Sequence, residues 1–164
     1  MRKTIFWAYI LLACLFTACQ DSSKLIVSDL QCEYLNAPLA IDNTTPHFGW
    51  KMTCGQNGTS SSAYQILVAT ELDKLNEEEA DLWNSGKVSS DTSLGIVYGG
   101  KALNSRTQAY WKVRVWNQAD VPSEWSKPSS FGIGMLSEND WSAEARFIGV
   151  EQADEKSQSA PLLR

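Results

Sequence analysis

Residues 110–116 read Tyr-Trp-Lys-Val-Arg-Val-Trp, an alternation of side-chain types that is typical of a half-buried β-strand. Successive side chains of a strand point to opposite faces of its sheet. The apolar face is expected to lie in a core: Trp111, Val113 and Val115. The other face is expected to point outward: Tyr110, Lys112, Arg114 and Trp116.

Similar alternation recurs on both sides of this strand. We expect six further strands, separated by Gly, Pro, Asn and Ser, at 30–34, 48–52, 63–70, 82–88, 94–98 and 131–135. In the first of them Leu30, Cys32 and Tyr34 would share a face. Residues 71–80 carry no apolar stripe and are expected to form a loop or one helical turn. The pattern predicts an all-β fold, a sandwich of about seven strands.

The first 18 residues resemble a bacterial export signal. Arg2 and Lys3 precede a short apolar run, which ends in Leu-Phe-Thr-Ala before Cys19. This ending resembles a lipobox, at which cleavage leaves the cysteine carrying lipid. The alternative is a plain secretory signal with the Cys19 thiol unmodified. We therefore expect an exported protein, anchored by lipid to the bacterial membrane, in the periplasm or on the cell surface.

We expect the chain to divide into four parts. We expect a lipoprotein signal peptide at 1–18, a tether at 19–23, the sandwich at 24–134, and a linker with the truncated start of a second β-domain at 135–164. Outside the signal and Cys19, the cysteines are Cys32 and Cys54. A hairpin around residues 36–45 would place Cys32 near Trp50, which favours two separate thiols over a disulfide.

Charge and composition exclude several functions. The chain has 14 basic and 19 acidic residues, a net charge of −5, and no basic run, so nucleic acid is excluded as a partner. His47 is the only histidine, and we expect no metal site and no cofactor. The acidic run Glu77–Glu79 could serve acid/base chemistry or calcium, but a solvated turn is the favoured interpretation.

The strand pattern resembles a fibronectin type III domain, an immunoglobulin-like sandwich. Leu103, Thr107 and Trp111 follow the spacing of such domains, with Trp50 on an earlier strand. One departure is Ala109, which stands where these domains usually carry the tyrosine of the tyrosine corner.

A narrower resemblance covers six blocks in the same order. They lie at 32–42 (Cys-Glu-Tyr-Leu-Asn-Ala-Pro-Leu-Ala-Ile-Asp), 46–50 (Pro-His-Phe-Gly-Trp), 62–68, 82–88, 110–116 and 123–126 (Ser-Glu-Trp-Ser). These blocks resemble the start of bacterial α-L-rhamnosidases. The resemblance implies an exported glycosidase that removes terminal α-L-rhamnose from plant or microbial glycans. It also implies that the acidic catalytic residues lie downstream in an α-helical toroid, so we expect this chain alone to be non-catalytic.

Aromatic side chains outside the predicted core are the candidate site: Tyr110, Trp116 and Trp125. They could form a sugar platform, contact the next domain, or stack on basic side chains. Ser-Glu-Trp-Ser at 123–126 resembles half of the Trp-Ser box of cytokine-receptor sandwiches, where Arg side chains layer between Trp rings. We therefore expect Trp125 to stack on Arg114 or Lys112.

Two functions remain open. The first is an accessory domain that spaces a rhamnosidase from the membrane and packs on the downstream domains of the same polypeptide. The alternative is a stand-alone surface lipoprotein module that binds rhamnose-containing glycan through its exposed aromatics. An enzyme on its own is disfavoured, because Asp29, Glu33 and Asp42 show no pairing of the kind that inverting hydrolysis needs, two carboxyl groups roughly 6.5–9.5 Å apart.

Overall fold

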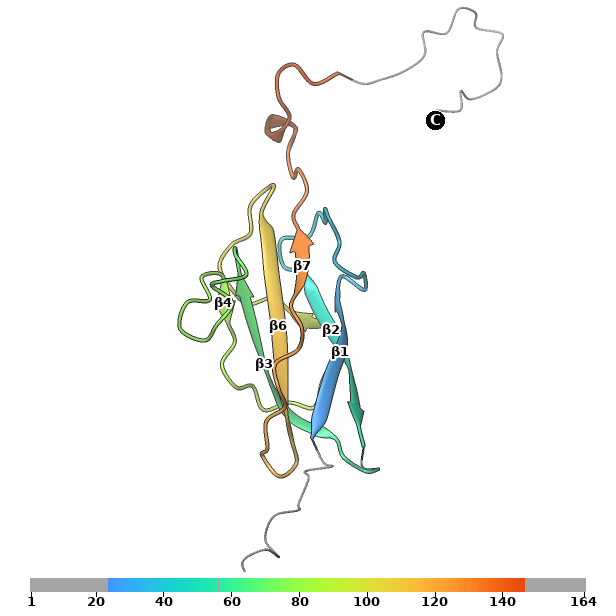
Figure 1. The fold of residues 1–164 in the computed structure, drawn as a ribbon. Helices are drawn as coiled ribbons and strands as arrows, with labels where there is room; N and C mark the ends of the chain where they lie inside the picture. The colour runs from blue at the N-terminus through green and yellow to red at the C-terminus, as the bar shows by residue number, and fades with distance from the viewer. Residues whose placement is uncertain (1–23, 56, 147–164) are drawn as a thin grey trace, which may run out of the picture.

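The computed structural model describes residues 24–55 and 57–146. In this part of the chain, seven strands form two antiparallel sheets (Figure 1). One sheet has the order β1-β2-β5: β1 (Leu25–Cys32), β2 (His47–Cys54) and β5 (Ile96–Val97). The other has the order β4-β3-β6-β7: β4 (Trp83–Asn84), β3 (Ser61–Ala69), β6 (Gln108–Asn117) and β7 (Ser129–Gly132). The predicted all-β sandwich is confirmed.

Aromatic rings dominate the core between the two sheets. The Phe48 ring centre lies 4.4 Å from that of Trp111 and 5.7 Å from that of Phe131. Trp50 packs edge-on against Tyr64 at 5.5 Å. The predicted inward face of β6 is confirmed, since all three of its apolar side chains are fully buried. Burial of each such side chain contributes about 1.5–3 kcal/mol to stability.

The first strand differs from its prediction. β1 begins at Leu25 and ends at Cys32, and a tight turn follows in which the backbone groups of Cys32 and Leu35 bond to each other at 3.0 Å. Glu33 and Tyr34 adopt φ values of 51° and 61° in this turn. The Tyr34 side chain is therefore 63% exposed, and the predicted face shared by residues 30, 32 and 34 is wrong. Non-glycine residues seldom adopt positive φ, so residue type gives no reason to expect a turn at this point. The alternation of side chains does not reveal it either.

Three other strands are shorter than predicted. β4 and β5 have two residues each. Gly86, with φ 59°, turns the chain after β4, and Val88 returns to the sheet only through a single bridge to Tyr64. At the last strand, Ile133 leaves the antiparallel ladder of β7 and makes a parallel bridge with Ile41.

The register of β1 and β2 separates the two cysteines. Cys32 lies opposite Phe48, and Cys54 lies opposite Leu25, at the other end of the strand pair. The distance is too long for a disulfide between them, in agreement with two separate thiols. Burial, together with the charge of Glu33, raises the pKa of the Cys32 thiol to about 12.

Several predictions fall outside this fold. The signal peptide, the tether and Cys19 lie outside the described residues, as does most of the predicted start of a second domain. Among the residues that are described, no helix is long and apolar enough to cross a membrane.

Candidate functional site

The outward face of β6 carries a stack of aromatic and basic side chains. The Arg114 guanidinium lies 4.6 Å from the centre of the Trp125 ring and 4.9 Å from that of Trp116. The Lys112 ammonium lies 4.9 Å from the Trp125 ring, and that of Lys87 lies 4.8 Å from the Trp116 ring. We call these five side chains the cation–π stack.

Trp125 reaches this face because its neighbours pair with the edge of β6. β7 pairs with β6 only from Gln108 to Trp111, so the remainder of this edge of β6 is not covered by β7. Beyond Trp111, the backbone N–H groups of Ser123 and Ser126 donate to the carbonyls of Val115 and Val113, at 2.8 and 2.9 Å. Their hydroxyl oxygens in turn accept from the buried N–H groups of the same two valines, each at 3.1 Å. The two serines therefore replace a strand partner and place Trp125, which lies between them in the sequence, over the sheet.

Polar side chains hold Arg114 in this position. The side-chain carbonyl oxygen of Gln65 accepts from both Nε and Nη2 of the guanidinium, at 3.2 and 2.8 Å. The amide of Gln65 donates to Asn84 at 2.9 Å, and a carboxylate oxygen of Glu77 pairs with Nη2 of Arg114 at 2.8 Å. Residues 77–79 form an exposed turn, as predicted, and Glu77 in this turn also pairs with Arg114. A planar donor held by these two side chains can stack between two rings.

Burial affects both the charged and the aromatic members of the cation–π stack. Burial lowers the pKa of Lys112, and the charge of Arg114 acts in the same direction, while Glu77 opposes it. Trp116 is only 7% exposed, although its side chain projects from the outward face as predicted. Cation–π contacts reach about 2 kcal/mol when they are desolvated.

This arrangement stabilises the sheet more readily than it binds sugar. A sugar ring needs an exposed aromatic face, whereas Arg114 and the two lysines already lie against the Trp116 and Trp125 rings. Tyr110 is half-buried and packs with a small cluster that includes Leu75. A glycan or domain contact of these three aromatics stays a prediction.

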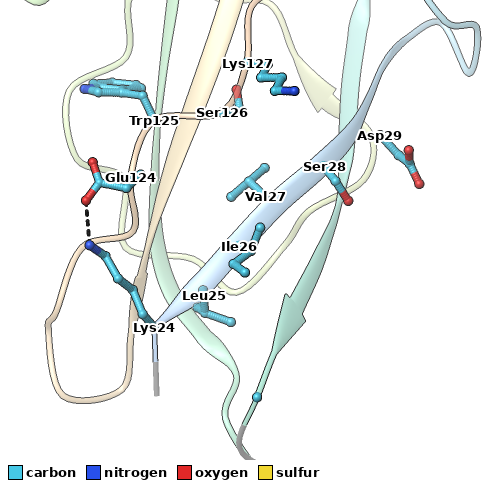
Figure 2. A pocket seen from close by; sticks show the side chains of 11 residues that line it. Lys24, Leu25, Ile26, Val27, Ser28, Asp29, Glu124, Trp125, Ser126 and Lys127 are labelled. Carbon is cyan, nitrogen blue, oxygen red and sulfur yellow. Dashed lines mark hydrogen bonds and ion pairs between the residues drawn. The ribbon is translucent and has the colours of Figure 1, made fainter. Parts of the chain in front are cut away.

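An open groove of about 750 Å³ runs between β1 and residues 124–127 (Figure 2). An ion pair crosses the groove. The ammonium nitrogen of Lys24, next to β1, lies 2.5 Å from a carboxylate oxygen of Glu124. The Trp125 ring points away from β1 in this view. Within the described chain β1 is an edge strand whose sheet partner is β2, so the groove is the open side of the sandwich.

The single histidine takes part in a polar contact beside β1. One carboxylate oxygen of Glu33 accepts from the His47 backbone N–H at 2.8 Å and from the Asn43 amide at 2.9 Å, and lies 3.0 Å from His47 Nδ1. Burial acts to raise the pKa of Glu33, but these hydrogen bonds outweigh it and hold the pKa below its ordinary 4.5. No group of three or more His, Cys, Asp or Glu residues suited to a metal occurs in the described ranges.

Two antiparallel sheets of three and four strands around a tryptophan-rich core define an immunoglobulin-type domain. Residues 27–137 match the family described as the Rha78A-like, N-terminal immunoglobulin domain. The chain belongs to this family, which confirms the resemblance to the N-terminal region of α-L-rhamnosidases.

Individual proteins agree with this assignment. An α-L-rhamnosidase of Formosa agariphila is 43% identical over 148 residues, which are 88% of this chain but 15% of that protein. The crystal structure of the Streptomyces avermitilis α-L-rhamnosidase complexed with L-rhamnose is 39% identical, with a TM-score of 0.69 over 72% of this chain and 11% of its own. The α-L-rhamnosidase structure from Dictyoglumus thermophilum is 34% identical, with a TM-score of 0.68 over 73% of this chain and 14% of its own. The chain thus spans about one seventh of the length of such relatives.

Proposed function

We propose that this chain is the N-terminal accessory domain of a longer, exported and lipid-anchored α-L-rhamnosidase. One observation carries the proposal: 88% of the chain aligns with an α-L-rhamnosidase of which it represents only 15%. The domain would space the catalytic part from the membrane and pack against its neighbours. On the outer face of β6, basic side chains already lie against the Trp116 and Trp125 rings, which favours a structural role of this face over glycan binding.

Enzyme activity tests the rhamnosidase part of the proposal. The full-length polypeptide should release nitrophenol from p-nitrophenyl α-L-rhamnoside, whereas residues 20–164 alone should not. Turnover by the short chain would assign the activity to this domain instead. Absence of turnover by the full-length protein, on this substrate and on rhamnose-containing glycans, would overturn the proposal.

Lipid attachment tests the anchoring part. Cells fed an alkyne-tagged fatty acid should label the wild-type protein in the membrane fraction. Cys19→Ala should abolish the label and move the protein out of that fraction. Cys32→Ala is the matched control and should keep the label, because Cys32 is buried in the sandwich. A wild-type protein without label would favour the plain secretory signal.

A further inference from the structure

The segment after β7, residues 135–141, is held against the end of the sandwich. The Asp140 carboxylate accepts from the Ser105 hydroxyl at 2.6 Å and from the backbone N–H groups of Leu136 and Ser137 at 3.0 and 2.8 Å. The Ser105 bond, followed by the backbone bonds, lowers the pKa of Asp140. The segment therefore has a defined path rather than that of a free tether.

Arg106, the residue after Ser105, also holds this segment. Its guanidinium donates to the backbone carbonyl of Asp140. Its own backbone N–H lies 3.1 Å from the Ile133 carbonyl, and the residue adopts φ 63°. We call Ser105, Arg106 and Asp140 the linker clasp. A non-glycine residue with positive φ is held there by its surroundings.

Large apolar side chains are exposed beside this clasp. Trp141 is 60% exposed, and Met135 and Leu136 are 42% and 39% exposed. The β1–β2 connection lies at the same end of the sandwich (Figure 1) and adds Leu39, which is 86% exposed. The Pro38 carbonyl accepts from the Gly132 N–H at 2.9 Å, which holds that connection against β7. We call Leu39, Met135, Leu136 and Trp141 the end patch.

Exposed apolar side chains that gather at one place on a surface, rather than singly, point to an interaction site. The chain leaves the sandwich through residues 135–146, so whatever follows in the polypeptide is tethered beside the end patch (Figure 1). A short tether gives its partner a high effective concentration without any further contact. The occupant that this geometry favours is therefore part of the same polypeptide.

We propose that the end patch is the docking surface for the next domain of the polypeptide, and that the linker clasp sets the angle between the two domains. This inference rests on the proposed function, which supplies the downstream domain. The surface buries Trp141 and Leu136 on docking. The clasp holds the segment before docking and so reduces the entropy lost on binding.

Limited trypsin digestion of the full-length polypeptide tests this inference. Arg146 is exposed in the described structure and lies just beyond the end patch. Docking should protect the bond after Arg146 in the wild type. Trp141→Ser and Leu136→Ser should each speed cleavage there about tenfold, because burial of such a side chain is worth more than a factor of ten in an equilibrium constant. Leu94→Ser is the control, since Leu94 is 58% exposed but lies beside Gly49 of β2 and is not part of the end patch.

A second measurement reports on Trp141 directly. The difference in fluorescence between the wild type and Trp141→Phe isolates this side chain, and iodide should quench it weakly in the full-length protein. Fast wild-type cleavage after Arg146, or strong iodide quenching, would overturn the docking surface. Protection that depends on protein concentration would assign the end patch to a second copy. Rhamnosidase activity with a solvent-exposed Trp141 overturns only the docking, whereas a protected Trp141 without activity overturns only the proposed enzyme.

Discussion

Arg114 lies between two indole rings, 4.6 Å from the Trp125 ring centre and 4.9 Å from that of Trp116. The two tryptophans come from different parts of the chain: Trp116 belongs to β6, and Trp125 belongs to the connection that leads to β7. One guanidinium thus joins that connection to the sheet. It also binds Gln65 on β3 and Glu77 on the loop that follows β3.

Arg114→Ala should lower the free energy of unfolding by about 2 kcal/mol, because it removes two cation–π contacts and leaves Gln65 and Glu77 without their donor. Urea unfolding of the protein would measure this. Arg114→Lys should recover only part of the loss, since an ammonium lacks the planar fork. Arg146→Ala is the control and should be neutral because Arg146 is exposed. An unchanged stability of Arg114→Ala would contradict the role assigned to the stack.

Ser126→Ala should destabilise the protein by about 1–2 kcal/mol, because the buried N–H of Val113 loses its acceptor. Ser123→Ala should do the same through Val115. Thermal unfolding of each variant checks the effect, with the exposed Ser89→Ala as a neutral control. Equal melting temperatures for all three variants would show that the serine hydroxyls do not replace a strand partner.

Gly132→Ala should be strongly destabilising, by about 2 kcal/mol or more. A Cβ atom at this position would lie 2.2 Å from the Leu39 carbonyl oxygen, so the β1–β2 connection would lose its hydrogen bonds to β7. Gly134→Ala is a matched control two residues away, because a Cβ there meets its neighbours at an ordinary 3.5 Å. Chemical denaturation compares the two. Similar losses in both variants would contradict the steric explanation.

Glu33→Gln should lower stability by about 1 kcal/mol at neutral pH, because charged acceptors form stronger hydrogen bonds than neutral ones. The folded-state pKa of Glu33 lies below its ordinary 4.5. Its ionised carboxylate therefore stabilises the fold above that value, and the contribution is lost as the pH falls below it. The difference between wild type and variant should shrink toward zero in acid, as urea titrations at several pH values would show. A constant difference across this range would mean that the charge of Glu33 is irrelevant.

Local patterns predicted the strands that alternate cleanly. The inward face of β6 could be read from the sequence, because side-chain direction follows from strand periodicity alone. The placement of Trp125 near Arg114 and Lys112 was also expected, from a short motif with a known packing mode. Each of these inferences depends on residues close together in the chain.

Contacts between segments that are far apart in the sequence could not be predicted from such local patterns. The chain positions of Lys87 and Glu77 do not indicate that they meet Trp116 and Arg114, since loops approach one another only after the strands have paired. The same holds for the linker clasp, in which Ser105 and Asp140 are 35 residues apart. No pattern in the sequence pointed to the end patch.

The sequence by itself thus determined the fold class, the core face of β6 and the family, because periodicity and short motifs are local properties of the chain. Only the tertiary structure decided that Trp116 is buried under two cations, that Glu77 pairs with Arg114, and that Trp141 is exposed beside a fixed linker. Burial and pairing depend on which surfaces the folded chain brings together, and that arrangement is a property of the whole sandwich.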